Sequence, residues 1–562
     1  MKKSQIMVVA AATALVSVAG VLTAPPLLAA TPDITVNTAS SYQTIDGFGA
    51  ATPIFNGSGS PWTTGETQTL VGTGQGQLGL SIVRTVVSPV SSEWGLYASS
   101  LQTAKSYGSD VKILASPWTA PANFKTNNSR VNGGKLRTDY YDDYATHLNN
   151  YVQYMKNQGV TIDVTSVQNE PDWHPDYDSM DWTGAEMRNF VRDQGTKITD
   201  TRLMVGESLR FARQYSDPSL QDATARNNIG YVGGHLYDAE NSGNLSPYPL
   251  AAQYGKNQWM TEWNLHAADG NGSNIWGNPS NTTVWNETLD DIMRTVHRSM
   301  ESGWSAYVWW YGRRFYSFIG DGESQYGTTK GAVLRRGNAF SQYSKYVRPG
   351  DKRVALSKSS RASSLEVTAY QGRGKVTLVI LNRSNSAVNN AVIQTPQSIS
   401  NAEYTVTSQN LGAASQPANL DDGQATISVP ARSISTITLT NGPTTPPTGQ
   451  PTTNPTTPPS TTPPPTTPPA GGSCTASVTP GTVWGDRYNT SVTVSGANNF
   501  TVVVAVTAPQ AITTSWSGSA SLSSNNTVLT MRSNGSGNTF GFTTMTNGNT
   551  SARPQIRSCT AG

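Results

Sequence analysis

The stretch Thr165-Ser-Val-Gln-Asn-Glu-Pro-Asp-Trp173 turns an apolar segment, Ile162–Val167, abruptly into polar residues. Pro171 has no N–H to donate to a β-ladder, so Asn169 and Glu170 are predicted to stand at the C-terminal end of a strand. In a barrel of parallel strands, that end is where active sites are built. The stretch therefore predicts a barrel strand with a carboxylate at its mouth.

A second stretch, Gln258-Trp-Met-Thr-Glu262, also ends an apolar run in a carboxylate. One such residue alone could be a solvated strand end, but two of them favour a catalytic pair. Retaining glycoside hydrolysis needs two carboxyl groups, because one protonates the leaving oxygen while the other attacks the sugar carbon. Glu207 also follows a strand, and we interpret it as a structural acceptor or an orienting group rather than a catalyst.

The composition narrows the possible partners. Charged residues make up 13% of the 562-residue chain, against about 25% in an average globular domain. Gly, Ser, Thr and Asn replace them, as is common in secreted proteins that act on polysaccharides. The net charge of +3 is too small to predict nucleic acid or an anionic membrane as a partner. Because the sequence shows neither a metal-binding His or Cys cluster nor a phosphate-binding glycine loop, we expect no metal and no cofactor.

The first 30 residues are typical of a secretory signal. Two lysines precede an apolar run over residues 6–28, which ends in small residues at Ala30. The run is long enough to span a bilayer, so a membrane anchor is the alternative. Two prolines near its end favour cleavage, and we expect a secreted, extracellular protein with no membrane attachment after cleavage. A monomer is the default expectation for such an enzyme.

Residues 47–347 alternate short apolar runs with helical stretches, which predicts an α/β fold, the (β/α)8 TIM barrel. The apolar residues Tyr144, Leu148, Tyr151, Val152 and Met155 recur at helical spacing and predict one of the helices. The expected strands are Leu80–Arg84, Val111–Ala115, Ile162–Val167, Leu203–Val205, Tyr231–Leu236, Gln258–Thr261 and Ala306–Trp310, with the first near Gly49–Phe55.

The remaining segments predict β structure and a tether. Residues 348–441 contain runs of period two and predict an attached antiparallel β-sandwich, which residues 31–46 are expected to join. Residues 442–472 are nearly all Pro, Thr and Gly and predict an extended linker. Residues 473–562 predict a separate all-β module.

The two cysteines of the chain, Cys474 and Cys559, stand near the ends of this last module. In an oxidising compartment we expect them to form a disulfide. Such a bond would join the first and last strands of a module whose apolar content is low.

Several long motifs in residues 33–441 resemble glycoside hydrolase family 30, and among its members the bacterial glucuronoxylan endo-1,4-β-xylanases. The motifs are Asp46-Gly-Phe-Gly49, Ala115-Ser-Pro-Trp118, Ser166-Val-Gln-Asn-Glu-Pro-Asp-Trp173, Gly234-His-Leu-Tyr237, Trp259-Met-Thr-Glu262, Ala306-Tyr-Val-Trp-Trp-Tyr311 and Tyr346 through Gly350. The resemblance implies that Glu170 is the general acid/base and Glu262 the nucleophile. It also implies substrate-binding roles for Trp118, Asn169, His235, Tyr237, Trp310, Arg314 and Tyr316. His235 could equally be a buried structural histidine.

Arg314 bears on the substrate. The resemblance implies that Arg314, Tyr316 and Trp310 hold a glucuronate branch, and a planar guanidinium suits a carboxylate. The alternative is that this arginine and its neighbour pair with acids such as Asp321 and Glu323.

The loop after the nucleophile departs from the glucuronoxylanase pattern. Asn264 and Ala267 stand where those xylanases often carry an aromatic residue and a hydroxyl near the branch sugar. The departure leaves the strictness of glucuronate recognition open. It is also the best argument for an endo-β-1,6-galactanase or β-1,6-glucanase of the same family.

The C-terminal module resembles carbohydrate-binding module family 2. Trp484 and Trp516 match tryptophans that stack on flat sugar faces in that family, and the alternative is that both are packing residues. Cellulose and xylan both remain open as its ligand.

Together, these observations predict a secreted, retaining endo-glycosidase that hydrolyses β-1,4-xylosidic bonds in glucuronoxylan, guided by the glucuronate side groups. Its expected partner is plant cell-wall polysaccharide: xylan for the catalytic part, with xylan and cellulose as the alternative ligands of the last module. Besides the β-1,6-glycanase, the alternative from another class is a non-catalytic polysaccharide-binding protein, in which Glu170 and Glu262 would be dispensable.

Overall fold

The structure is a computed structural model that describes residues 31–54, 60–108, 110–267, 274–441, 474–481, 486–507, 509–523, 526–533 and 537–561. It divides into two compact units, Met1–Thr448 and Gly449–Gly562. The expected signal and linker lie outside the described residues. Within the described part, the helices are too short or too polar to cross a membrane.

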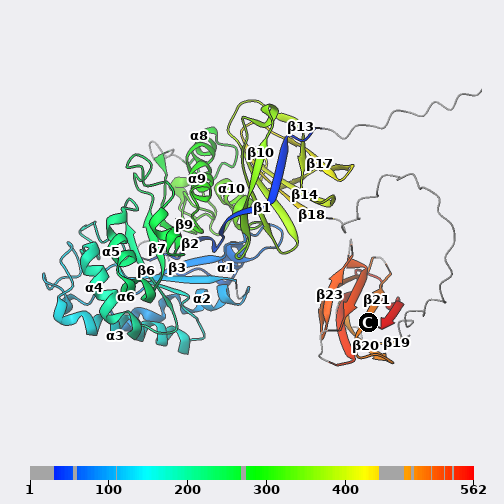
Figure 1. Ribbon diagram of the computed structural model, residues 1–562, viewed down its shortest axis with the longest axis horizontal. Helices are drawn as coiled ribbons and strands as arrows, with labels where there is room; N and C mark the ends of the chain where they lie inside the picture. The colour runs from blue at the N-terminus through cyan, green and yellow to red at the C-terminus, as the bar shows by residue number, and fades with distance from the viewer. Residues whose placement is uncertain are drawn as a thin grey trace, which may run out of the picture. The chain divides into compact units, whose positions relative to one another are not determined.

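The first unit contains the predicted TIM barrel, and the fold class is confirmed (Figure 1). Eight parallel strands pair in chain order, and β2 closes the ring against β9. Their bounds are β2 Gly47–Ala51, β3 Ile82–Val86, β4 Lys112–Ser116, β5 Val164–Ser166, β6 Arg202–Ser208, β7 Ile229–His235, β8 Asn257–Glu262 and β9 Ala306–Tyr311.

Inward-facing apolar side chains from these strands fill the barrel, so its interior is a packed core and not a channel. The first strand lies a few residues earlier than the sequence predicts. It includes Gly49, where a Cβ atom would lie 2.1 Å from the carbonyl oxygen of Ile82. The close approach of β2 to β3 therefore requires glycine at this position.

Helices cover the outside of the barrel. The face predicted on residues 144–155 lies in α3, and all five of its apolar residues are buried. The α-helices are α1 Thr64–Val71, α2 Ala98–Lys105, α3 Tyr141–Asn157, α4 Gly184–Gln194, α5 Asp217–Gln221, α6 Ala223–Asn228, α7 Pro249–Gln253, α8 Thr282–Asn286, α9 Arg294–Glu301 and α10 Arg335–Ser344, and the π-helical turn η7 Glu287–Met293 joins α8 to α9.

A ten-stranded sheet forms the side domain of this unit. β1 pairs with β10 antiparallel and with β13 parallel, so the start of the described chain lies inside the sheet (Figure 1). The two ends of the sheet approach each other where β14 contacts β17, and they enclose a second apolar core. In order across the sheet, the strands are β15 Ala414–Gln416, β14 Ile399–Ser408, β18 Ser433–Asn441, β12 Lys375–Asn382, β11 Glu366–Gly372, β10 Lys352–Lys358, β1 Ile34–Thr44, β13 Val388–Gln394, β17 Gln424–Val429 and β16 Asn419–Asp421.

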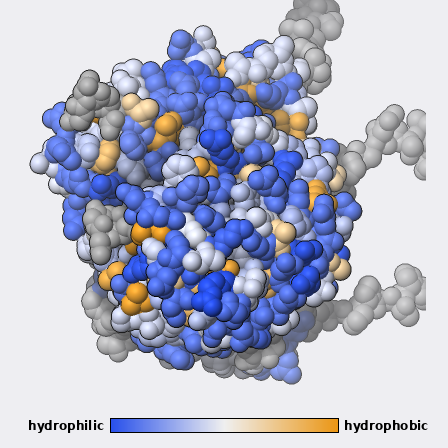
Figure 2. Space-filling view, turned by 90° about the vertical axis from the view of Figure 1, so that its left-hand side faces the viewer, coloured by the Kyte–Doolittle hydropathy of each residue, from blue (hydrophilic) through white to orange (hydrophobic). Residues whose placement is uncertain are grey.

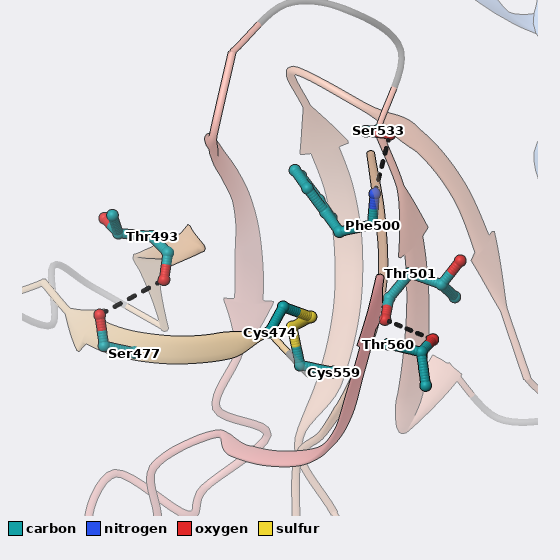
Figure 3. Close-up of a disulfide and its surroundings, with 8 residues drawn as sticks. All are labelled: Cys474, Ser477, Thr493, Phe500, Thr501, Ser533, Cys559 and Thr560. Carbon is teal, nitrogen blue, oxygen red and sulfur yellow. Dashed lines mark hydrogen bonds between the residues drawn. A yellow bond between two sulfur atoms is a disulfide. The ribbon is translucent and has the colours of Figure 1, made fainter. Parts of the chain in front are cut away.

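The second unit is a sandwich of two four-stranded antiparallel sheets. Cys474, just before β19, and Cys559 in β26 form the predicted disulfide, which joins one sheet to the other (Figure 3). One sheet contains β19 Thr475–Pro480, β20 Arg487–Ser495, β25 Thr539–Met545 and β22 Ala511–Trp516; the other contains β23 Ser519–Leu522, β24 Val528–Arg532, β21 Phe500–Ala505 and β26 Gln555–Ala561.

The surface is polar although charged residues are few. The face in Figure 2 is largely hydrophilic, with hydrophobic residues in small separate patches.

Candidate active site

The C-terminal ends of neighbouring barrel strands bring a cluster of charged side chains together. Glu170 follows β5, Glu207 lies near the end of β6, and Glu262 is the last residue of β8. The backbone N–H of Glu170 donates to the carbonyl oxygen of Glu207 at 2.9 Å. Both residues have a positive φ, 44° and 46°, which non-glycine residues seldom adopt. Such strain persists where the surrounding structure fixes it, typically at functional sites.

Arg84 in the middle of β3 connects this cluster, and its side chain is fully buried. Its Nη1 donates to Oε2 of Glu262 at 2.6 Å, and its Nη2 donates to Oδ1 of Asn169 at 2.6 Å and to Oε1 of Glu207 at 3.1 Å. The sequence pattern predicted a strand that ends at Arg84 and gave this residue no role, but the strand continues to Val86. The available signal was a single cation inside an apolar run, where a charge needs a buried partner.

His235 at the end of β7 is fully buried, so it lies behind the carboxylates instead of lining an open cleft. Its Nδ1 is 3.0 Å from Oε1 of Glu170, and its Nε2 is 3.7 Å from Oε1 of Glu207. Burial alone would lower the pKa of His235, but Glu262 and the other two glutamates outweigh it and raise that pKa to about 9. The imidazole is therefore a cation near neutral pH.

Glu262 accepts hydrogen bonds on both oxygens. In addition to Arg84 on Oε2, the hydroxyl of Tyr237 donates to Oε1 at 2.9 Å. Asn264, the departure noted in the sequence, donates its Nδ2 to that same hydroxyl at 2.8 Å. Asn264 therefore helps to orient the hydroxyl that binds Glu262, and this contact makes it part of the site.

The catalytic candidates face each other closely. A carboxylate oxygen of Glu170 and one of Glu262 lie within 4.8 Å of each other. With all three glutamates ionised, the two cations Arg84 and His235 would leave one net negative charge in a buried cluster. A single proton on the pair neutralises the cluster, and buried charges favour such balance.

The pKa shifts follow from this arrangement. Burial would raise the pKa of Glu207, but Arg84 and His235 lower it to about 2. Burial raises the pKa of Glu262, the charge of Glu170 raises it further, and His235 and Arg84 oppose the rise. Burial would lower the pKa of Arg84, yet Glu207 and Glu262 hold it above its ordinary value. Arg84 and His235 therefore hold Glu207 as an anion, whereas burial and the charge of Glu170 oppose ionisation of Glu262.

The same atoms have the spacing of a metal site, because Glu170, His235 and Glu262 offer ligand atoms within 4.8 Å of one another. A metal ligand must be deprotonated, and a histidine with a pKa of about 9 holds its proton at neutral pH. Arg84 also occupies Oε2 of Glu262. This donor set fits proton transfer better than metal binding.

Aromatic side chains border the cluster. The Arg84 guanidinium lies over the Trp118 ring at 4.7 Å, and the rings of Trp118 and Trp310 are 6.0 Å apart. Trp118 is 3% exposed, so little of its ring is available to a ligand. Tyr316 is also buried and stacks on His266, with ring centres 4.9 Å apart. The structure thus brings the predicted aromatic residues to the same end of the barrel.

Arg314 is held by acids of its own chain. Its Nη1 donates to Oε1 of Glu323 at 2.7 Å and is 3.7 Å from Oδ2 of Asp321. Arg313 is buried and pairs with Glu66. Both arginines are therefore paired with acids of the same chain, as in the alternative to glucuronate binding.

The C-terminal unit contains the two tryptophans that the family resemblance implies stack on sugars. Trp484 lies outside the described residues. Trp516, at the end of β22, is 42% exposed. A Cβ atom on Gly541 would lie 2.3 Å from its ring, so the indole lies over this glycine of β25.

Two carboxyl groups facing each other at the mouth of a TIM barrel, among buried donors and aromatic rings, define a glycoside hydrolase. A family model described as the glycosyl hydrolase family 30 TIM-barrel domain matches residues 91–277. Glucuronoxylanase XynC of Bacillus subtilis (strain 168) is 34% identical over 388 residues, which cover 68% of this chain and 85% of that protein. The chain therefore belongs to glycoside hydrolase family 30.

Solved structures agree with this assignment. The family 30 subfamily 8 xylanase Xyn30A from Clostridium acetobutylicum has a TM-score of 0.60 and 29% identity, covering 73% of this chain and 99% of that chain. A family 30 endoxylanase from Clostridium papyrosolvens C71 has a TM-score of 0.59 and 30% identity, covering 73% of this chain and 100% of that chain.

Replacing Arg84 tests its role beside Glu262, the predicted nucleophile. A nucleophile must be ionised to attack, so the raised pKa of Glu262 predicts an acid limb of kcat/KM above the ordinary glutamate value of about 4.3. Arg84→Gln removes a group that favours the ionised form, so the limb should move to higher pH. kcat should also fall about a hundredfold or more, the usual loss for one preorganised donor.

Arg84→Lys is the matched variant, since it keeps the charge but cannot reach three acceptors at once. Its acid limb should move less. If Arg84→Gln does not fold, Arg84→Lys still tests the role of this side chain. An acid limb that stays in place in a folded Arg84→Gln protein would contradict this role.

Proposed function

We propose that this protein is a secreted, retaining endo-β-1,4-xylanase that acts on glucuronoxylan. The observation that carries the proposal is the short separation of the Glu170 and Glu262 oxygens, within 4.8 Å. Retaining enzymes place their carboxyl groups about 5–5.5 Å apart, whereas inverting enzymes need about 6.5–9.5 Å to admit a water molecule. The separation supports direct attack by one carboxylate on the sugar.

The roles follow from the contacts. Glu262 accepts hydrogen bonds from Arg84 and Tyr237, which stabilise its anion, so it attacks the anomeric carbon and forms a glycosyl-enzyme. Glu170 donates the proton of the pair to the leaving oxygen. It then takes a proton from the water that hydrolyses the intermediate, and the original sugar configuration is restored.

Asn169 is the group proposed to hold the sugar. Its Oδ1 accepts from Arg84, which orients the amide, so Nδ2 is the group that would donate to a sugar hydroxyl beside the cleavage point. Such a hydrogen bond strengthens in the transition state.

Xylan is the proposed substrate because two relatives that each cover more than two thirds of this chain are named glucuronoxylanases, and two similar structures are named xylanases. The glucuronate part depends on Arg314. The Glu323 side chain is 38% exposed, and ion pairs of this kind are worth only about 0–1 kcal/mol. A substrate carboxylate could therefore displace Glu323 at small cost.

We also propose that the C-terminal module binds the same plant cell-wall material, xylan or cellulose, through Trp516. The support is an exposed indole lying over Gly541, a flat apolar surface on an otherwise polar sheet. Such a surface suits stacking against a sugar ring.

Removing either catalytic carboxyl should separate catalysis from binding. Glu170→Gln should lower the rate on xylan by about 10²–10⁴-fold, the contribution typical of general acid–base catalysis, and Glu262→Gln by at least as much. Binding to insoluble xylan should be unchanged. Glu301→Gln, a carboxyl at the end of α9, is the matched control. Binding without hydrolysis by wild type would support the non-catalytic alternative, and full hydrolysis by both variants would contradict the roles proposed for Glu170 and Glu262.

Product analysis tests the branch specificity. Wild type should cut glucuronoxylan into products that each carry one glucuronate near the reducing end, and Arg314→Ala should lose that pattern. Glu323→Gln should lower KM for glucuronate-bearing oligosaccharides several-fold, because it removes the internal competitor.

Two results of the same assay would contradict this specificity. If wild type cuts debranched xylan as well as glucuronoxylan, the arginine is structural or serves another ligand. Cutting of only a β-1,6-galactan or β-1,6-glucan would favour the β-1,6-glycanase alternative.

Retention on insoluble polymer tests the module. In the full chain carrying Glu262→Gln, the additional change Trp516→Ala should weaken binding to insoluble cellulose or xylan about tenfold. Leu522→Ala, on the other sheet and 39% exposed, should have no effect. Equal binding by all three proteins would show that Trp516 is a packing residue.

A further inference from the structure

The loop that follows Glu170 carries two exposed aromatic side chains to which the proposed mechanism gives no role. Trp173 is 46% exposed and Tyr177 is 42% exposed. In the part of the chain that the structure describes, Trp173 and Trp516 are the exposed tryptophans. Large aromatic rings left in water at the mouth of a barrel suggest a ligand surface, because burying them inside would be more favourable.

This loop is held firmly by its neighbour, the loop between β4 and α3. Arg130 makes two hydrogen bonds to Asp178, at 3.0 and 2.6 Å. The buried Lys125 donates its Nζ to the carbonyl oxygen of Ser179 at 2.6 Å. Isolated β-bridges join Val131 to Asp178 and Lys135 to Asp181. The aromatic rings therefore stand on a fixed base, which lowers the entropy lost when a ligand is bound.

The two rings lie beside the proposed acid. The backbone N–H of Trp173 donates to the carbonyl oxygen of Glu170 at 3.0 Å, so a single turn connects them. Burial, and then the charge of Glu170, raises the pKa of Tyr177 to about 12, which places this hydroxyl within electrostatic reach of the same carboxylate. Trp173 and Tyr177 therefore adjoin the group that protonates the leaving oxygen.

The order of the barrel strands indicates the direction in which a bound polysaccharide would run across the barrel mouth. In the closed ring β2 to β9, β5 and β9 are four positions apart and so lie on opposite sides of the barrel. Trp310 and Arg314 come from the end of β9, whereas Trp173 and Tyr177 come from the loop after β5. A linear polysaccharide crossing the mouth at Glu170 and Glu262 would meet one group on each side.

We propose that Trp173 and Tyr177 form a platform that binds the sugars on the leaving-group side of the cleaved bond. Because Glu170 gives its proton to the leaving oxygen, the residues beside it face the part of the substrate that departs. The ligand class is the β-linked pyranose backbone of the substrate, bound through ring stacking and independent of its acidic branches. This inference rests on the proposed function.

A length series of oligosaccharides tests the platform. Each substrate has the same glucuronate-bearing non-reducing part and one, two or three xylose units on the leaving side. For wild type, kcat/KM should rise with each unit. For Trp173→Ala it should stay nearly flat, with about a tenfold loss on the longest substrate, mostly in KM, and no loss on the shortest. Trp173→Tyr should restore most of the rise, and Tyr177→Ala should give a smaller loss of the same kind.

The control is Tyr107→Ala, a tyrosine beyond the end of α2 with a similar exposed fraction, 40%, which should behave as wild type. Equal loss by Trp173→Ala on every substrate length would mean that Trp173 only supports the Glu170 loop, and would overturn the proposal. An unchanged length dependence would overturn it too. If wild type cuts only another glycan, the proposed function fails, and the same series built on that glycan tests the platform separately.

Discussion

The active site depends on one buried cation, the guanidinium of Arg84, and on the carboxylates that surround it. Three acidic side chains could not be buried together without compensation, because an unpaired charge in the interior is costly. Arg84 and the protonated His235 balance two of the three charges, and the hydrogen bonds of Arg84 fix the orientation of Glu207 and Glu262. The third negative charge has no cationic partner, so one proton bound to the cluster would neutralise it.

The barrel is what makes this cluster possible. Its members come from β3, β5, β6, β7 and β8, and parallel strands present all their carboxyl ends on one face. The positive φ angles at Glu170 and Glu207 turn the side chains inward from the strand ends. Stability for this strain comes from the packed core of the barrel beneath.

Different contacts separate catalysis from specificity. The buried contacts of Arg84 and His235 are nearly shielded from water and belong to the chemistry. The ion pair of Arg314 with Glu323 and the exposed rings of Trp173 and Tyr177 lie at the surface, where partners exchange easily. Substrate preference can therefore change through surface loops without disturbing the catalytic pair. The loop after Glu262 is an exception, since Asn264 contacts the Tyr237 hydroxyl that binds Glu262.

The sequence by itself determined the fold class and the two catalytic candidates, because local patterns carry that information: apolar runs of strand length, and a carboxylate where each run stops. It did not assign Arg84 a role or show that His235 is buried behind the carboxylates. Those facts depend on which strand ends meet across the barrel mouth, and residues as far apart as Arg84 and Glu262 have no local signature of contact. The partner of Arg314 was likewise left open between a substrate branch and nearby acids. Only the tertiary structure placed Glu323 against it, because the loop that carries this acid folds back over the strand end.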